Sequence, residues 1–458
     1  MKKPNNLQFS NISEKRFRKD ERRNNKNKYF SGKESVFDKI QRIRTTIDLE
    51  LIKKYHTSLI DFLTSKDFFQ EVKPEKYFVI GNDFTLENNF DYVLRTTREI
   101  ISAVYAHNDE IVIDFSNTIN IDFPALFLFK TLMFEIEGIK DSLNSQLQAI
   151  QLETNFKILK SEKSEKVNNL LFVVFGIPFE KSDDDESLKP YSCIYLTGKR
   201  RQRNYNENKK GIHTTKISNY ISEQCLKQHN FELSDEGRNK FDGMISEILN
   251  NAEDHGTFNK WYIGASYLKE SNNDSLKAVG EVNICFLNFG DSIFQAFQAT
   301  KEQNFNAYND LQELLIYHKS LKERKGFTEE NLITLYSLQE GISRLKFERE
   351  SRGTGTINFI KSFFDIGDYE DKIKGYVPKM QIISGHTSLK CDKKYQPYQE
   401  DGVYCLSLNS QKSLKYLPDP TYLKHQTGDF PGTMLFIKVY LNEQHLTNKH
   451  NDNGEGKD

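Results

Sequence analysis

Two side chains on one predicted helix have the types needed for joint chemistry. Glu247 and Asn251 lie four residues apart in FDGMISEILNNAEDHG, so a helix places them on the same side, one turn apart. A carboxylate there can take a proton from an attacking water or hydroxyl, and an amide oxygen suits Mg²⁺ that already carries phosphates. The same spacing is common on solvated helix faces, so the pair alone does not define a site.

A second candidate position lies where an apolar strand ends. The segment EVNICFLNFGDSI runs into a glycine turn that contains Asn288 and Gly290. The Asn288 amide oxygen can accept a hydrogen bond from an exocyclic amine such as that of adenine, and Gly290 lets the backbone approach the base. The alternative is a plain strand-to-loop turn.

A glycine turn then opens another predicted helix. RESRGTGTINFIKSFF places Gly353 and Gly355 ahead of a helical apolar period, and the N–H groups and positive dipole end of a helix start attract phosphate. Arg349 and Arg352 add positive charge to this turn. Helix capping alone would account for the same glycines. Two strands, KMQIISGH and GTMLFIKVYL, follow and are expected to pair in one sheet.

The elements that position these residues belong to a chain long enough for two or three domains, with 37% hydrophobic residues among 458. We divide it into a basic disordered arm (1–34), a helical segment (35–69), an α/β domain (70–181), an acidic linker (182–190), the domain with the candidate site (191–445) and a polar tail (446–458). The arm holds eleven Lys or Arg and four Asp or Glu, an excess of seven positive charges on a chain of net charge -1.

The predicted α/β domain contains two strand-helix repeats. IVIDFSNTINIDFPAL starts a strand, a turn and a helix, and KILKSE with EKVNNLLFVVFGIP repeats strand and helix. This pattern resembles the STAS family. Asp122, Phe123 and Pro124 stand where phosphorylatable members carry serine, which argues against regulation by serine phosphorylation there. An ordinary α/β spacer domain is the alternative.

The order of the motifs in 191–445 resembles the GHKL superfamily of ATP-binding domains, and EILNNAEDHG and ERESRGTGTINFIKSFFD are most similar to anti-sigma-factor serine kinases. The resemblance implies a Bergerat-type α/β sandwich with helices on one face of a mixed sheet, and ATP and Mg as cofactors. It implies Glu247 as catalytic base and Asn251 as magnesium ligand. It further implies that nucleotide is bound by Asn288, Gly290, Arg352, the phosphate cradle Gly353, Thr354, Gly355 and Thr356, and Thr433 near the adenine.

Two departures from the family pattern bear on this expectation. Asn288 stands where the family has the aspartate of D-x-G-x-G, and Ser292 stands at its second glycine. An amide keeps an acceptor but loses the charge-assisted bond, so adenine affinity or selectivity is expected to be reduced. The roughly sixty residues between Ser292 and Arg352 have helical patterns, long for a simple lid, which indicates contact with a partner.

Several other classes are excluded or disfavoured. The chain has no G-x-x-x-x-G-K-[ST] motif, and no apolar run long enough for a membrane span or signal peptide. Five dispersed cysteines indicate reduced thiols in a cytoplasmic protein. His56 lacks the residues usual after a phosphorylated histidine, and His255 is interpreted as a helix-end histidine.

We therefore expect an ATP-dependent regulatory switch or weak ATPase that acts on a partner protein. The alternative is a serine/threonine protein kinase of the anti-sigma type, with Glu247 as base. Nucleic acid would be bound only through the basic arm, and a homodimer stays open.

Overall fold

The structure, a computed structural model, describes most of the chain between residues 75 and 442. The described residues are 75–106, 110–146, 156–176, 192–199, 209–227, 232–255, 260–269, 278–302, 305–322, 326–339, 355–367, 378–400 and 402–442. The predicted arm (1–34), helical segment (35–69), acidic linker (182–190) and polar tail (446–458) lie outside them. The described part is mixed α and β, which confirms the expected α+β class.

Residues 75–176 form a small unit that we call the α/β layer. Strands β1, β3 and β5 form a parallel sheet in this order, as expected where a helix connects one strand to the next. The strands and helices are β1 (Tyr77–Val79), β2 (Asp83–Phe84), α4 (Phe90–Ala106), β3 (Ile111–Asp114), β4 (Asn120–Ile121), α5 (Phe123–Gln146), β5 (Phe156–Leu159) and α6 (Glu165–Phe175). Both predicted strand-helix repeats are confirmed, with Pro124 in the first turn of α5.

Residues 192–442 contain a five-stranded sheet in the order β6-β7-β8-β12-β9, which we call the large sheet. Its strands are β6 (Ser192–Lys199), β7 (Lys260–Lys269), β8 (Ala278–Phe289), β9 (Lys379–Cys391) and β12 (Leu423–Asn442). All four pairings are antiparallel, so the expected mixed sheet is wrong. The connection between β7 and β8, residues 270–277, is shorter than the crossover that a parallel pair needs.

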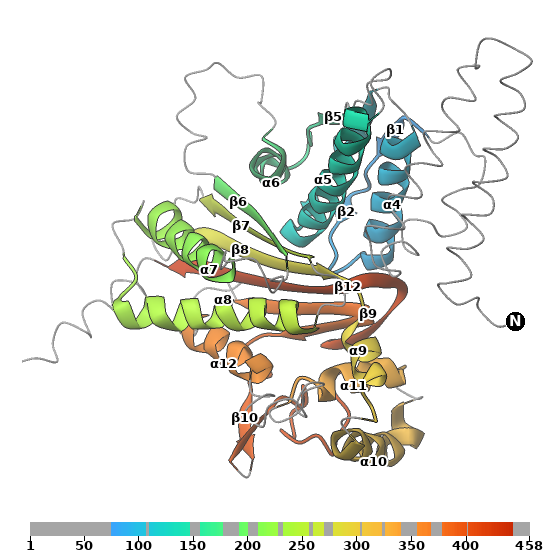
Figure 1. Ribbon diagram of the computed structural model, residues 1–458, viewed down its shortest axis with the longest axis vertical. Coiled ribbons are helices and arrows are strands. Elements are labelled where there is room, and N and C mark those ends of the chain that lie inside the picture. Colours follow the sequence, from blue (N-terminus) through green and yellow to red (C-terminus); the bar gives the residue numbers. More distant parts are fainter. Residues whose placement is uncertain are drawn as a thin grey trace, which may run out of the picture.

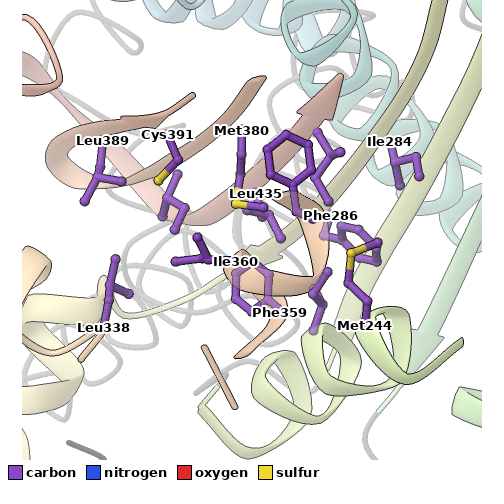
Figure 2. Packing of buried hydrophobic residues seen from close by; sticks show 14 of the residues in the cluster. Met244, Ile284, Phe286, Leu338, Phe359, Ile360, Met380, Leu389, Cys391 and Leu435 are labelled. Atoms are coloured by element: carbon purple, nitrogen blue, oxygen red, sulfur yellow. The ribbon is translucent and has the colours of Figure 1, made fainter. Parts of the chain in front are cut away.

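Helices α7 (Lys209–Tyr220), α8 (Asp235–His255) and α12 (Gly355–Gly367) cover one face of the large sheet (Figure 1). A short π-helix, Ile221–Leu226, continues α7. The predicted apolar faces of α8 and α12 are buried, among them Met244 and Ile360. Figure 2 shows both side chains in one hydrophobic cluster with Phe286 of β8, between the helices and the sheet. Burial of the periodic apolar face is what holds such helices in place.

The α/β layer covers the opposite face of the large sheet. Helices α4, α5 and α6 lie on the side away from α8 and α12 (Figure 1). Alternate residues of the sheet strands, such as Leu287 and Phe436, join α5 residues in one hydrophobic cluster. Gly264 of β7 leaves the space that the Phe127 ring of α5 fills, since a Cβ there would lie 2.4 Å from that ring. The large sheet is therefore the middle of a layered structure.

Three helices and a hairpin complete the described part. Helices α9 (Ile293–Ala299), α10 (Phe305–Lys322) and α11 (Glu329–Tyr336) lie beyond one end of the large sheet, and β10 (Tyr398–Glu400) pairs with β11 (Val403–Cys405). The helical patterns predicted between Ser292 and Arg352 are confirmed over the described residues. No helix of the described residues is long and apolar enough to cross a membrane. All five cysteines are free thiols, as expected.

Candidate functional site

The start of α12 lies against the last turns of α8. The Asn251 Nδ2 atom donates to Thr356 Oγ1 at 3.5 Å, and both side chains are half-buried. Thr356 is the second residue of α12, directly after Gly355, so the candidate metal ligand lies at the positive end of a 13-residue helix. Arg352, Gly353 and Thr354 lie outside the described residues.

Glu247 lies one turn before Asn251 on α8 and is half-buried. Helix α7 fixes this stretch of α8 from the side. Lys210 Nζ donates to Asn250 Oδ1 at 2.8 Å, and the Thr214 and Ser246 hydroxyls lie 3.3 Å apart. These contacts flank Glu247 in sequence. The carboxylate and amide predicted to share one side of the helix therefore lie on a segment of α8 that side-chain contacts join to α7.

A polar row crosses the helix-facing side of the large sheet. Asn288 of β8 is the register partner of Trp261 on β7 and of Thr433 on β12, and Thr433 is the partner of Ser384 on β9. Register partners in antiparallel strands share a face. Trp261 belongs to the core beneath α7, α8 and α12, so this face is the one that the helices cover. We call Trp261, Asn288, Thr433 and Ser384 the polar row.

Hydrogen bonds hold the side chains of the polar row in place. The Asn288 amide nitrogen donates to the Lys260 carbonyl at 3.0 Å. Ser384 Oγ lies 2.8 Å from Thr433 Oγ1 and accepts from the backbone N–H of Ile293 at 2.8 Å. Since Ile293 is the first residue of α9, the row is tied directly to the start of the α9–α11 insertion.

Two glycines bring the β8 and β12 backbones close beside Asn288. Gly290 has φ 142° and Gly432 has φ 138°, values that residues other than glycine rarely adopt. A Cβ at Gly432 would lie 2.1 Å from the Asn288 carbonyl oxygen. Gly290 N donates to the carbonyl of Pro431 at 3.2 Å, which closes the end of this strand pair. The glycine turn predicted after Asn288 is therefore a structural requirement of the close approach.

The helix residues and the polar row lie at the same end of the structure. The His213 ring of α7 contacts the Trp261 ring edge-on, with centroids 5.1 Å apart. Lys210, three residues before His213, contacts Asn250 of α8, and Thr214, directly after His213, contacts Ser246. The stretch of α8 with Glu247 and Asn251 therefore lies over the end of the sheet where Trp261 neighbours Asn288.

The departure at Ser292 has a structural explanation. The Ser292 side chain accepts from the Gln295 backbone N–H at 3.1 Å, and the Gln295 side chain accepts from the Ser292 N–H at 2.9 Å. This capping box starts α9 immediately after the Gly290 turn. A glycine could not serve this purpose as well, because it has no side-chain acceptor.

Sequence reasoning missed Trp261 and Ser384. Trp261 is the single tryptophan and begins an apolar segment, and Ser384 directly precedes Gly385 in ISGH, but neither spacing indicates a neighbour of Asn288. Among the described residues, no group of three or more His, Cys, Asp or Glu is arranged to hold a metal. Within that part of the chain, magnesium at this site would depend on Asn251 and on oxygens that the ligand itself supplies.

Comparisons with known proteins identified no relative of this chain. No family model matches the chain, and no curated protein and no solved structure matches it.

Proposed function

We propose that this chain binds ATP with magnesium between α8, the start of α12 and the polar row, and acts as a nucleotide-dependent regulatory switch or weak ATPase of the GHKL type. The observation that carries the proposal is the 3.5 Å contact between Asn251 and Thr356. It joins the candidate metal ligand to the start of the candidate phosphate helix. The two belong to motifs 105 residues apart that the family resemblance assigned to one site.

The contact with Thr356 uses the amide nitrogen of Asn251 and not its oxygen. The oxygen, which is the only atom of the amide that can ligate a cation, therefore lies on the other side of the group. Magnesium held there would neutralise phosphate charge, and the backbone N–H groups at the start of α12 would bind phosphate oxygens. Glu247, one turn away, would take the proton of an attacking water.

The polar row would hold the base. The Asn288 side chain is buried on the helix-facing side, and its amide oxygen would accept from the exocyclic amine of adenine. Thr433 is half-buried next to it and adds a hydroxyl, already 2.8 Å from that of Ser384. A neutral amide makes a weaker bond than a carboxylate, which is consistent with modest affinity rather than with tight retention.

The switch, as opposed to simple hydrolysis, is supported by the connection between the polar row and α9. Ser384 binds both Thr433 and the first N–H of α9, so a ligand that displaces the Thr433 hydroxyl changes the anchoring of this helix. Helix α10 follows and presents exposed apolar side chains, including Ile316 and Tyr317. They offer a surface on which nucleotide occupancy could alter contact with a partner.

Calorimetry on the full chain tests the proposal. ATP, ADP and a non-hydrolysable analogue are titrated with Mg²⁺ and, separately, with excess chelator. We expect saturable binding that Mg²⁺ strengthens, and a parallel change in the fluorescence of Trp261, the single tryptophan and the neighbour of Asn288. Absence of both signals up to about 1 mM nucleotide, where even a weak site gives measurable occupancy, would rule the proposal out.

A further inference from the structure

One residue of the large sheet touches both the candidate base-binding side chain and the α/β layer. The backbone carbonyl of Lys260 accepts from Asn288 Nδ2 at 3.0 Å. A carbonyl can accept only from the nitrogen end of an amide, so this bond fixes which way the amide group is turned. The Asn288 oxygen consequently faces away from Lys260. Any ligand amine that it accepts depends on where Lys260 lies.

The side chain of Lys260 is held by the α/β layer. Its ammonium forms an ion pair with Glu135 of α5, and the two side chains are only 12% and 3% exposed. The ammonium also lies 5.7 Å from the centroid of the Phe134 ring and 5.2 Å from that of Tyr262. A buried, hydrogen-bonded ion pair has little freedom to rearrange, because moving either charge alone leaves the other without compensation in a poorly solvated place.

The position of Lys260 in β7 explains why its side chain and its carbonyl contact different neighbours. It is the first residue of the strand, and Trp261, the next residue, packs beneath the helices. Successive side chains point to opposite faces, so the Lys260 side chain points to the α/β layer while its carbonyl lies in the plane of the sheet beside Asn288. The ion pair with Glu135 of α5 therefore holds Lys260 in place, and with it the position of the carbonyl that orients Asn288.

We propose that Lys260 is a positioning residue through which α5 of the α/β layer orients Asn288 and so sets the affinity and selectivity of the site for adenine. This inference rests on the proposed nucleotide site. It gives the α/β layer a function beyond covering the sheet, since a ligand or partner that shifts α5 would change base recognition on the opposite face.

A second ion-pair contact of the α/β layer provides the control. Lys166 of α6 pairs with Glu281 at 2.8 Å, and Glu281 belongs to β8, the same strand as Asn288, seven residues earlier. Glu281 keeps a second partner, Lys438, at 2.9 Å. Lys166→Met therefore removes an ion pair between the same layer and the same strand without touching the surroundings of Asn288.

The test compares ATP and GTP affinity in full-length variants. The double variant Glu135→Gln/Lys260→Met removes both charges together, which avoids burying either alone. We expect about fivefold weaker ATP binding, the size of one misplaced hydrogen bond, with GTP affinity little changed, so the ATP-to-GTP preference falls. Lys166→Met is expected to keep the wild-type preference, and Lys260→Arg, which retains the charge pair, is expected to keep most of it.

Equal weakening of ATP and GTP, or an unchanged preference, would overturn the positioning function and leave Lys260 a merely structural residue. Should the double variant not fold, Glu135→Gln alone, which keeps an acceptor for Lys260, is expected to shift the preference in the same direction to a smaller extent. An unchanged preference in this single variant would equally overturn the inference.

A nucleotide-free measurement separates this inference from the proposed function. Acrylamide quenching of Trp261, which is 1% exposed and adjacent to Lys260, is expected to rise in the double variant and not in Lys166→Met. If the wild-type chain binds no nucleotide, the proposed site fails, and quenching still shows whether Lys260 fixes this strand end. Identical quenching in all the variants would contradict the positioning function.

Discussion

Asn251 of α8 and Thr356 of α12 lie within hydrogen-bonding distance, 3.5 Å between Nδ2 and Oγ1, and Glu247 precedes Asn251 by one helical turn. In the proposed site, this arrangement would separate two functions on one helix face. The amide meets the helix start where phosphate would bind, and the carboxylate is set back by a turn, where a water or hydroxyl could lie between it and the phosphate. Binding and chemistry should therefore respond to different substitutions.

Asn251→Ala is expected to weaken Mg²⁺-dependent ATP binding about tenfold, since it removes the metal ligand. Glu247→Gln should leave ATP affinity near wild type and abolish turnover, because a base acts only in the chemical step. Calorimetry and phosphate release measure the two effects. Asn239→Ala and Glu236→Gln, at exposed positions near the start of α8, serve as matched controls. Equal loss of binding in the two site variants would indicate a structural pair.

Gly432→Ala is expected to destabilise the fold by about 3 kcal/mol or more, because the new Cβ would meet the Asn288 carbonyl oxygen at 2.1 Å. Gly402→Ala is the control. Gly402 also has positive φ, 84°, but has open space around it, so only the backbone strain of about 1 kcal/mol applies. Urea unfolding of both variants gives the difference, and equal losses would refute the close-packing explanation.

Glu87 connects the α/β layer to β9 through a pH-dependent contact. Desolvation opposes its ionisation, but the ammonium groups of Lys379 and then Lys390 outweigh this and lower the pKa of Glu87 to about 2. The folded state therefore favours the carboxylate, and this stabilisation is present above the ordinary pKa of 4.5 and lost as the pH falls towards 2. Glu87→Gln should lower the free energy of unfolding at pH 7 and have little effect near pH 2. Glu75→Gln, at an exposed position, should leave the free energy of unfolding nearly unchanged at both pH values.

The contribution of Asp122 to stability is expected to have the opposite pH dependence to that of Glu87. Burial raises the pKa of Asp122 to about 7, although it accepts hydrogen bonds from the N–H groups of Ala125 and Glu87. The folded state then favours the protonated acid, so its contribution is full below the ordinary pKa of 3.8 and is lost as the pH rises through about 7. Asp122→Asn should therefore be more favourable for stability at pH 8 than at pH 4. A pH-independent effect of this substitution in urea unfolding would contradict the assignment.

Local patterns were sufficient for the elements but not for their arrangement. The period of α8 and α12 is visible because each buries one continuous face, and the β8 turn is visible because Gly290 and Asn288 are typical turn residues. The antiparallel order of the large sheet depends on strand pairings between distant segments, such as β8 with β12, for which one sequence gives no register.

The proximity of the candidate residues follows only in part from the sequence, because the contacts that join them are non-local. The proximity of Asn251 to Thr356 was expected only from the family resemblance, since no spacing rule joins residues 105 positions apart. Burial of the large sheet beneath α5 was not expected. Glu135 and Lys260 are 125 residues apart, and their pairing follows from the packing of two units that sequence periodicity treats separately.

The fate of the γ-phosphate distinguishes the switch from the kinase. A kinase must leave label on a serine or threonine of a second protein, whereas a switch releases phosphate to water or only holds ATP. The α/β layer is a poor internal acceptor, because Phe123 at the start of α5 is buried and Pro124 follows it, where the STAS domains that the sequence resembles carry serine. We expect that γ-labelled ATP, incubated with the chain and a lysate of its native cell, gives no labelled band that disappears with Glu247→Gln. Glu236→Gln, on the exposed start of α8, controls for loss of helix charge. A band that vanishes in Glu247→Gln and persists in Glu236→Gln would make the kinase the better function, with Glu247 acting on a protein hydroxyl instead of water.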